Sequence, residues 1–148
     1  MAPEKLVYTI TASARIGAPG RGSVRRMADA DDVRAAYEKY LSSFTANDLA
    51  GIDSVVSYPL AHIADGRVLM FDTFPIDPAG LMAAKGWHTT VDSRYEVVAI
   101  SATKAHVVLY EGRRVRADGS LIETVSAFYA FTRTADGWKM YAISDIVT

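Results

Sequence analysis

The three histidines of this chain are the side chains best suited to moving a proton near neutral pH, because imidazole titrates near pH 6.5. His62 lies between apolar residues, where it can act as a general acid or base or as a hydrogen-bonded structural histidine. His88 follows Trp87 and can reach the rim of a pocket, whereas a structural role is expected for His106. Their separations of 26 and 18 residues match no metal-binding motif, so no metal is expected.

Tyrosines and one late aspartate add further candidates for chemistry. Tyr40 lies on the apolar face of a predicted helix, either as a core aromatic or as a donor to a carbonyl or enolate oxygen. Asp145 lies near the end of the last predicted strand, as a pocket acid or as a surface carboxylate. The side chains that can line an apolar, substrate-binding cavity, or simply fill the core, are Tyr58, Phe71, Trp87, His88, Tyr95 and Phe128.

Several classes of protein are excluded by what the sequence lacks. The chain of 148 residues has no cysteine, which excludes disulfides and thiolate chemistry. It has no Gly-x-Ser-x-Gly, Gly-x-Gly-x-x-Gly or phosphate-loop motif. With a net charge of −1 and no long apolar run, neither nucleic acid nor a membrane is expected as a partner. Cytoplasmic location and an activity without a cofactor are expected.

The first 28 residues differ in composition from the rest. They carry five basic residues against Glu4 alone, which gives +4 and leaves −5 for the remaining 120. We expect residues 1–28 to be a flexible basic extension, or an artefact of an upstream start codon with Met27 as the natural first residue. A transit peptide is the other interpretation. Residues 6–10 are β-prone and could add an edge strand.

Helical spacing is clearest in residues 33–44. Apolar residues recur there on one face, and Asp29, Asp31 and Asp32 form a helix-start signal before them. A short second helix is predicted from Leu49, with Asn47 or Asp48 as its cap and an end at Tyr58-Pro59. A third is predicted over residues 78–85, between Asp77-Pro78 and Gly86.

Strands are predicted from alternation and from repeated Asp-Gly turns. Residues 60–64 and 67–72 form a small hairpin, and a meander of four strands follows over residues 91–101, 105–116, 121–133 and 138–147. In the first strand of the meander, alternation places Val91, Ser93, Tyr95, Val97 and Ala99 on one face. Asp92, Arg94 and Glu96 then lie on a solvated face.

This order of elements resembles the nuclear transport factor 2-like superfamily, which includes ketosteroid isomerase, scytalone dehydratase and the SnoaL-like polyketide cyclases. The most specific match is the segment 40–52, YLSSFTANDLAGI, and residues 118–140 resemble the closing hairpin. The resemblance covers residues 29–148. It implies an α+β fold, in which a cone-shaped curved antiparallel sheet wraps around about three helices and encloses a pocket. It also implies a homodimer formed through the sheet.

The nearest parallel at the level of residues is with ketosteroid isomerase. The resemblance places Tyr40 at the oxyanion-hole tyrosine and Tyr129 near the second oxyanion donor, which is a protonated aspartate in that enzyme. The general-base aspartate has no counterpart, and His62 is the nearest basic group. The sequence therefore predicts isomerase, cyclase or dehydratase-like chemistry on a hydrophobic cyclic carbonyl or hydroxyl compound. The alternative is a non-catalytic module that binds a small molecule or a partner.

Overall fold

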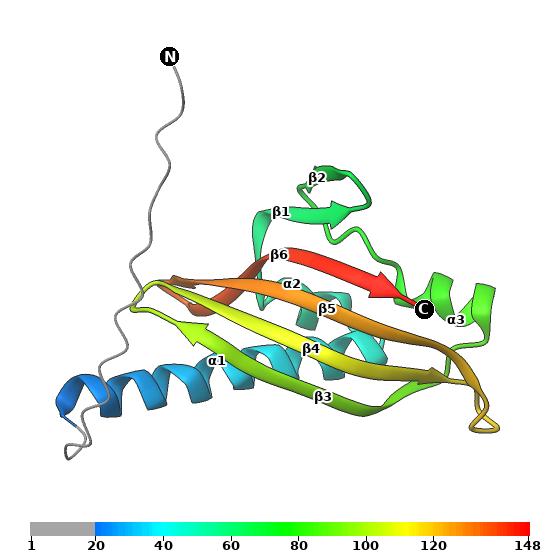
Figure 1. The fold of residues 1–148 in the computed structure, drawn as a ribbon. Helices are drawn as coiled ribbons and strands as arrows, with labels where there is room; N and C mark the ends of the chain where they lie inside the picture. The colour runs from blue at the N-terminus through cyan, green and yellow to red at the C-terminus, as the bar shows by residue number, and fades with distance from the viewer. Residues whose placement is uncertain (1–19) are drawn as a thin grey trace.

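A curved sheet of six strands, with helices against its concave face, makes up residues 20–148, the part of the chain that the computed structural model describes (Figure 1). The strand order is β2-β1-β6-β5-β4-β3. The predicted α+β class is confirmed. The elements are α1 (Arg21–Thr45), α2 (Leu49–Asp53), β1 (Val56–Ala64), β2 (Arg67–Phe71), α3 (Pro78–Lys85), β3 (Thr89–Ile100), β4 (Lys104–Val115), β5 (Leu121–Thr134) and β6 (Gly137–Val147).

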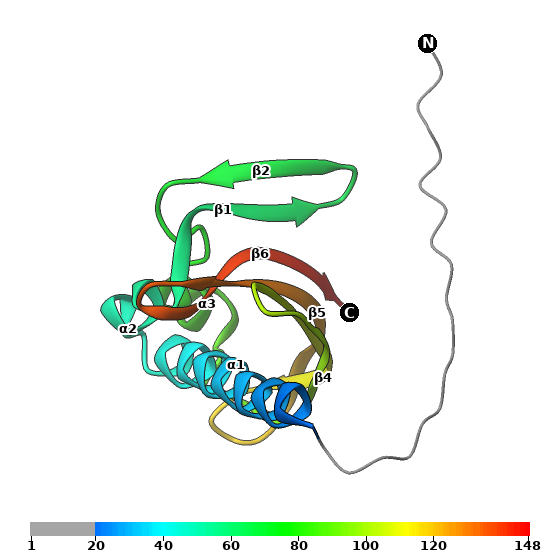
Figure 2. The same ribbon diagram turned by 90° about the vertical axis from the view of Figure 1, so that its left-hand side faces the viewer.

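The predicted hairpin is confirmed, but its position in the sheet was not predicted from the sequence. β1 pairs with β2 through the turn at Gly66, and its other edge pairs in parallel with β6, so that His62 lies beside Ile143. The sheet is therefore mixed rather than purely antiparallel. Figure 2 shows the hairpin standing beyond β6, away from α1. Tyr58-Pro59 lies inside β1 and does not end a helix, because α2 already ends at Asp53.

The long helix α1 begins at Arg21, well before the predicted start. Residues 21–28, predicted to be part of a flexible extension, are helical, whereas residues 1–19, including the predicted strand at 6–10, lie outside the described residues. Asp29 does not cap the helix. It is buried on the sheet side and forms an ion pair with Arg133 of β5. Pairing of a buried carboxylate with a guanidinium explains why an acidic residue is tolerated inside the helix.

The apolar face predicted for α1 is confirmed, and it packs aromatic rings onto the sheet. The ring centroid of Tyr37 lies 4.8 Å from that of Tyr95 and 4.9 Å from that of Tyr129. Tyr37 is fully buried, and its hydroxyl has no hydrogen-bond partner among residues 20–148. Burial raises its pKa far above the usual range, and the neighbouring Tyr129 raises it further. These contacts hold the helix at a fixed height above the sheet.

Both short helices have the capping residues that the sequence predicted. Asp48 caps α2, since its carboxylate accepts a hydrogen bond of 2.9 Å from the backbone N–H of Gly51. Gly86 ends α3 in the left-handed conformation with φ of 69°, which glycine adopts without a steric penalty. The loop after α3 leads directly into β3.

Two adjacent bulges bend β3 and β4 and change which side chains face inward. The register shifts between Val91 and Arg94 on β3, where Asp92 has a positive φ of 54°. It shifts again between Leu109 and Gly112 on β4. A bulge reverses the alternation beyond it. Val91 is therefore exposed, against the prediction that it shares the face of Ser93.

Candidate active site

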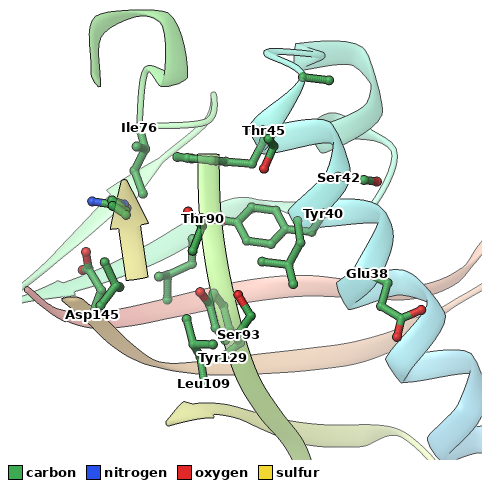
Figure 3. Close-up of a pocket in the computed structure, with 16 residues that line it drawn as sticks. Glu38, Tyr40, Ser42, Thr45, Ile76, Thr90, Ser93, Leu109, Tyr129 and Asp145 are labelled. Carbon is green, nitrogen blue, oxygen red and sulfur yellow. The ribbon is translucent and has the colours of Figure 1, made fainter. Parts of the chain in front are cut away.

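A cavity of about 550 Å³ lies between α1 and the inner face of the sheet. Figure 3 shows Tyr40 reaching into it from the helix, with Thr90, Ser93, Leu109, Tyr129 and Asp145 on the opposite side. Its apolar wall consists of Leu41, Phe44, Ile76, Leu109, Val125 and Ile143. A cavity of this size with a mainly apolar surface is typical of a small-molecule site.

Two predicted catalytic residues, Tyr40 and Tyr129, meet in this cavity. Their ring centroids are 5.8 Å apart, and each side chain is about 95% buried, with 5% of the residue surface exposed. No hydrogen bond to a residue of the described part of the chain contributes to the pKa of the Tyr40 hydroxyl, whereas the hydroxyl of Tyr129 lies close to that of Tyr37. Burial raises the pKa of Tyr129 to about 12, and burial also raises that of Tyr40 well above its usual value. Both hydroxyls therefore stay protonated and can donate hydrogen bonds to a ligand.

The other two predicted catalytic residues, His62 and Asp145, form a pair. His62 Nε2–H donates a hydrogen bond of 2.8 Å to Asp145 Oδ1, and the two side chains are 22% and 24% exposed. Parallel pairing of β1 with β6 brings them together across 83 positions of sequence. Asp145 lines the cavity, whereas His62 is not among the residues that do. The carboxylate therefore faces the cavity and the imidazole supports it from behind.

One cavity residue, Arg114, was not predicted from the sequence. Its guanidinium Nη1 lies 2.7 Å from Glu123 Oε1, and Lys85 Nζ lies 2.6 Å from the other oxygen of the same carboxylate. Burial raises the pKa of Glu123, but the hydrogen bonds from Lys85 and Arg114 outweigh this, and the net shift is downward. Strict alternation from Leu109 places Arg114 on the outer face. The bulge on β4 turns it inward, and the sequence carries no clear signal of that bulge.

The predicted substrate-binding residues do not line the cavity. Phe128 lies directly before Tyr129 on β5. Because Tyr129 faces the cavity, alternation places the Phe128 side chain on the outer face of the sheet, where it packs against His106. Trp87 is buried in the core against Phe44, although its Nε1–H donates to the cavity residue Thr90.

The remaining members of that set lie outside the cavity wall for different reasons. Tyr95 packs on Tyr37 and donates to Glu38, and Tyr58 donates to Asp53. Phe71 lies on the edge strand β2, where it pairs with Leu60 of β1 and is half-buried. His88 is exposed directly before β3. None of the six side chains predicted to bind substrate lines this cavity, and their role in substrate binding stays a prediction.

The Tyr40 hydroxyl can be tested by ligand binding. We expect Tyr40→Phe to weaken the binding of planar phenolates by about 1–3 kcal/mol, because a donor to the ligand oxygen is lost. The measurement is titration calorimetry with wild type and variant. Tyr110→Phe, on the exposed outer face, is the control and should bind as the wild type does. Unchanged affinity in Tyr40→Phe would return this hydroxyl to a purely structural role.

Comparison with known proteins identifies the fold. No protein-family model matches the chain, and no curated protein matches it. Among solved structures, an NTF2-like protein from Cytophaga hutchinsonii is 19% identical, with a TM-score of 0.60 over 80% of this chain and 97% of that one. A hexachlorocyclohexane dehydrochlorinase from Novosphingobium barchaimii is 15% identical, with a TM-score of 0.57 over 84% and 90%. An NTF2-like protein with a cystatin-like fold from Novosphingobium aromaticivorans is 13% identical, with a TM-score of 0.59 over 87% and 90%.

The protein therefore has the nuclear transport factor 2-like fold, as its sequence predicted. Similarity at this level of identity establishes the architecture and leaves the chemistry to the site. Within residues 20–148, no helix is long and apolar enough to cross a membrane, and no three His, Asp or Glu side chains converge as metal ligands.

Proposed function

We propose that this protein is a small-molecule enzyme of isomerase or lyase type, which moves a proton on a hydrophobic cyclic carbonyl or hydroxyl compound. One observation carries the proposal: the Asp145 carboxylate, hydrogen-bonded to His62, faces a cavity that also contains the hydroxyls of Tyr40 and Tyr129. A proton acceptor and two donors to a developing negative charge are the groups that enolisation requires.

The chemistry follows from these positions. The Asp145 carboxylate accepts a proton from the carbon next to a substrate carbonyl. The electron pair of that C–H bond forms a C=C bond, and the π electron pair of the C=O bond moves onto the carbonyl oxygen. Tyr40 and Tyr129 donate hydrogen bonds to this oxygen as its charge develops. Return of the proton to a different carbon completes an isomerisation. Departure of a leaving group from the β carbon, with re-formation of the carbonyl, completes an elimination. The dehydrochlorinase of the same fold supports the elimination branch.

In this scheme His62 is a positioning residue. Its Nε2–H holds one oxygen of the Asp145 carboxylate and so fixes the direction of the other oxygen, which accepts no hydrogen bond within residues 20–148 and can face substrate. The sequence had suggested His62 as the group that moves the proton. The geometry favours Asp145 for that step, because Asp145 lines the cavity and His62 does not.

Deuterium exchange tests the proposal without knowledge of the natural substrate. The protein is incubated in D₂O with 2-tetralone and with cyclohexenones, and the loss of α-carbon protons is followed by NMR. We expect saturable exchange above the rate without protein. Saturable binding of these ketones without any exchange would instead support the alternative, a non-catalytic small-molecule-binding module.

A second proposal concerns the outer face of the sheet and retains the expected homodimer. Apolar side chains on that face are widely exposed, with Ile146 at 66%, Val68 at 60% and Met70 at 59%. Register places all three on the face opposite His62 and Asp145. Exposed apolar area of this kind is typical of a protein–protein interface.

The homodimer is tested by Ile146→Glu, which we expect to convert a dimer to a monomer in sedimentation velocity, because a charge would be buried at the interface. Leu49→Glu is the matched control, since Leu49 is 54% exposed on the helical side of the molecule. A wild type that sediments as a monomer at all concentrations would refute the homodimer.

Cytoplasmic location stays a prediction.

A further inference from the structure

Arg114 is the cationic side chain on the cavity wall among the described residues, and its charge is only partly neutralised. Its side chain is 13% exposed, and its counterion Glu123 is 11% exposed. Glu123 is shared with Lys85, so one carboxylate balances two cations and the trio keeps a net charge of +1. A largely desolvated cation with an excess of positive charge is costly unless an anion joins it.

The guanidinium also has hydrogen-bonding capacity to spare. Arginine carries five N–H donors, and the contact with Glu123 uses Nη1. Asp145 lines the same cavity, but its carboxylate is held by His62, and within residues 20–148 it forms no ion pair with Arg114. The remaining donors can therefore take a carboxylate in the forked geometry that arginine prefers.

The charge of Arg114 reaches the interior of the cavity. Burial dominates the pKa of Tyr40 and of Tyr129 and raises both, whereas the positive charge of Arg114 acts on both in the opposite direction. Arg114 and the two hydroxyls thus share one electrostatic environment.

Strand register gives the order of these groups along the cavity. On β5, Arg114 pairs with Glu123, Asp145 pairs with Ala127, and Tyr129 follows two residues later. Four residues of strand separate the first two levels, which is about 13 Å at roughly 3.3 Å per residue. Along β5, the backbone level of Asp145 therefore lies between the level of Arg114 and that of Tyr129. Val125 and Leu109 form apolar wall along this path.

We infer that the substrate carries a carboxylate, which Arg114 binds, so that the reacting carbonyl lies near Tyr40 and Tyr129 with an apolar body between. This inference rests on the proposed function, because it takes the same cavity as the substrate site. It narrows the substrate class from a hydrophobic carbonyl compound to an amphipathic keto acid or hydroxy acid. The bulge that turns Arg114 inward is then a determinant of specificity.

Binding of matched probes tests the carboxylate site. The probes are 4-phenylbutanoate and its uncharged amide, 4-phenylbutanamide, which have nearly the same shape, and the measurement is titration calorimetry at neutral pH. We expect the wild type to bind the acid about tenfold more tightly than the amide, since a charge-assisted bond is made only with the acid. Arg114→Gln should lose this preference and keep the affinity for the amide.

Arg113→Gln is the matched control, because Arg113 is 45% exposed and pairs with Asp92 away from the cavity. It should retain the tenfold preference. Glu123 stays paired with Lys85 when Arg114 is replaced, which protects the fold. Should Arg114→Gln still melt early, Arg114→Lys serves instead: it keeps the charge, loses the fork, and is expected to show a reduced but measurable preference.

The possible failures are distinguishable. Equal affinity of the wild type for acid and amide would overturn the carboxylate site and leave the proposed enzyme intact. A preference that survives Arg114→Gln, or that Arg113→Gln removes, would also overturn it. Binding of neither probe, combined with no deuterium exchange on ketones, would overturn the cavity as a substrate site and the proposed function with it.

Discussion

Asp145→Asn is expected to lower the rate of ketone deuterium exchange by about 10²–10⁴-fold, the usual contribution of a general base. The amide has nearly the same shape as the carboxylate but cannot accept the substrate proton. NMR in D₂O measures the exchange rate, and a melting curve checks that the fold is intact. Asp136→Asn makes the same chemical change at a turn where the side chain is 84% exposed, and it should leave the rate unchanged.

His62→Gln separates the two roles within the pair. Glutamine can still donate a hydrogen bond to Asp145, so we expect a smaller loss of rate than in Asp145→Asn, about tenfold, and a changed pH profile because the imidazole is gone. A larger loss in His62→Gln than in Asp145→Asn would make His62 the proton acceptor and contradict the assignment. Loss of stability in step with loss of activity in both variants would indicate a structural pair.

Strong destabilisation at alkaline pH is the second large effect that we expect, and the buried tyrosines cause it. Burial raises the pKa of Tyr37 and Tyr40 well above the ordinary value of 10.0, and that of Tyr129 to about 12. In the unfolded chain these groups ionise near pH 10, while in the folded protein they stay neutral. The folded state then holds more protons than the unfolded state, so stability falls as pH rises above 10.

The size of this alkaline effect follows from the same shifts. Tyr129, whose pKa rises to about 12, loses roughly 2–3 kcal/mol of stabilisation between about pH 10 and 12. Tyr37 and Tyr40 lose stabilisation in the same direction as pH rises above 10, so the combined loss is a large part of the whole stability of a domain. Tyrosinate absorbance and circular dichroism should therefore change in one cooperative step below about pH 12.

Two variants check the cause of the alkaline transition. Tyr37→Phe should move its midpoint to higher pH and also stabilise the protein at neutral pH by about 1 kcal/mol, because a buried hydroxyl without a partner is removed. Tyr110→Phe should move the midpoint far less, because Tyr110 is exposed on the outer face and its pKa is raised mainly by its hydrogen bond to Glu96. Gradual titration of all tyrosines in the folded protein would show that their hydroxyls are accessible to solvent.

Local chemistry made most of the fold predictable. The Asp-Gly turns, the cap at Asp48 and the left-handed Gly86 act over a few residues, so their signals are present in short segments. The boundaries of α3 and the four strands of the meander are confirmed to within about two residues. The cavity residues Tyr40, Tyr129 and Asp145 were also predicted as site residues. The family resemblance indicated Tyr40 and Tyr129, and a position near the end of the last strand indicated Asp145.

The rest of the site depends on geometry that alternation does not encode. A single extra residue at each bulge reverses which face the following side chains occupy. Strict alternation therefore predicts the wrong face of the sheet for both Arg114 and Val91. Parallel pairing of β1 with β6 joins distant segments, and no local pattern indicates it. Phe128 lies outside this cavity although it is aromatic, because alternation with Tyr129 places its side chain on the outer face beside His106.

The junction of β1 with β6 also sets the order in which the molecule can be completed. β1 is synthesised before the meander, but its partner strand β6 follows all the other elements described here, so β1 and its hairpin have no sheet to join until residues 137–147 exist. Contacts of long sequence separation form late, because closing a long loop costs chain entropy. The meander can assemble from neighbours alone. The hydrogen bond between His62 and Asp145 therefore cannot form before β6 has been synthesised, and a polypeptide that ends before β6 has helices α1, α2 and α3 but lacks this pair.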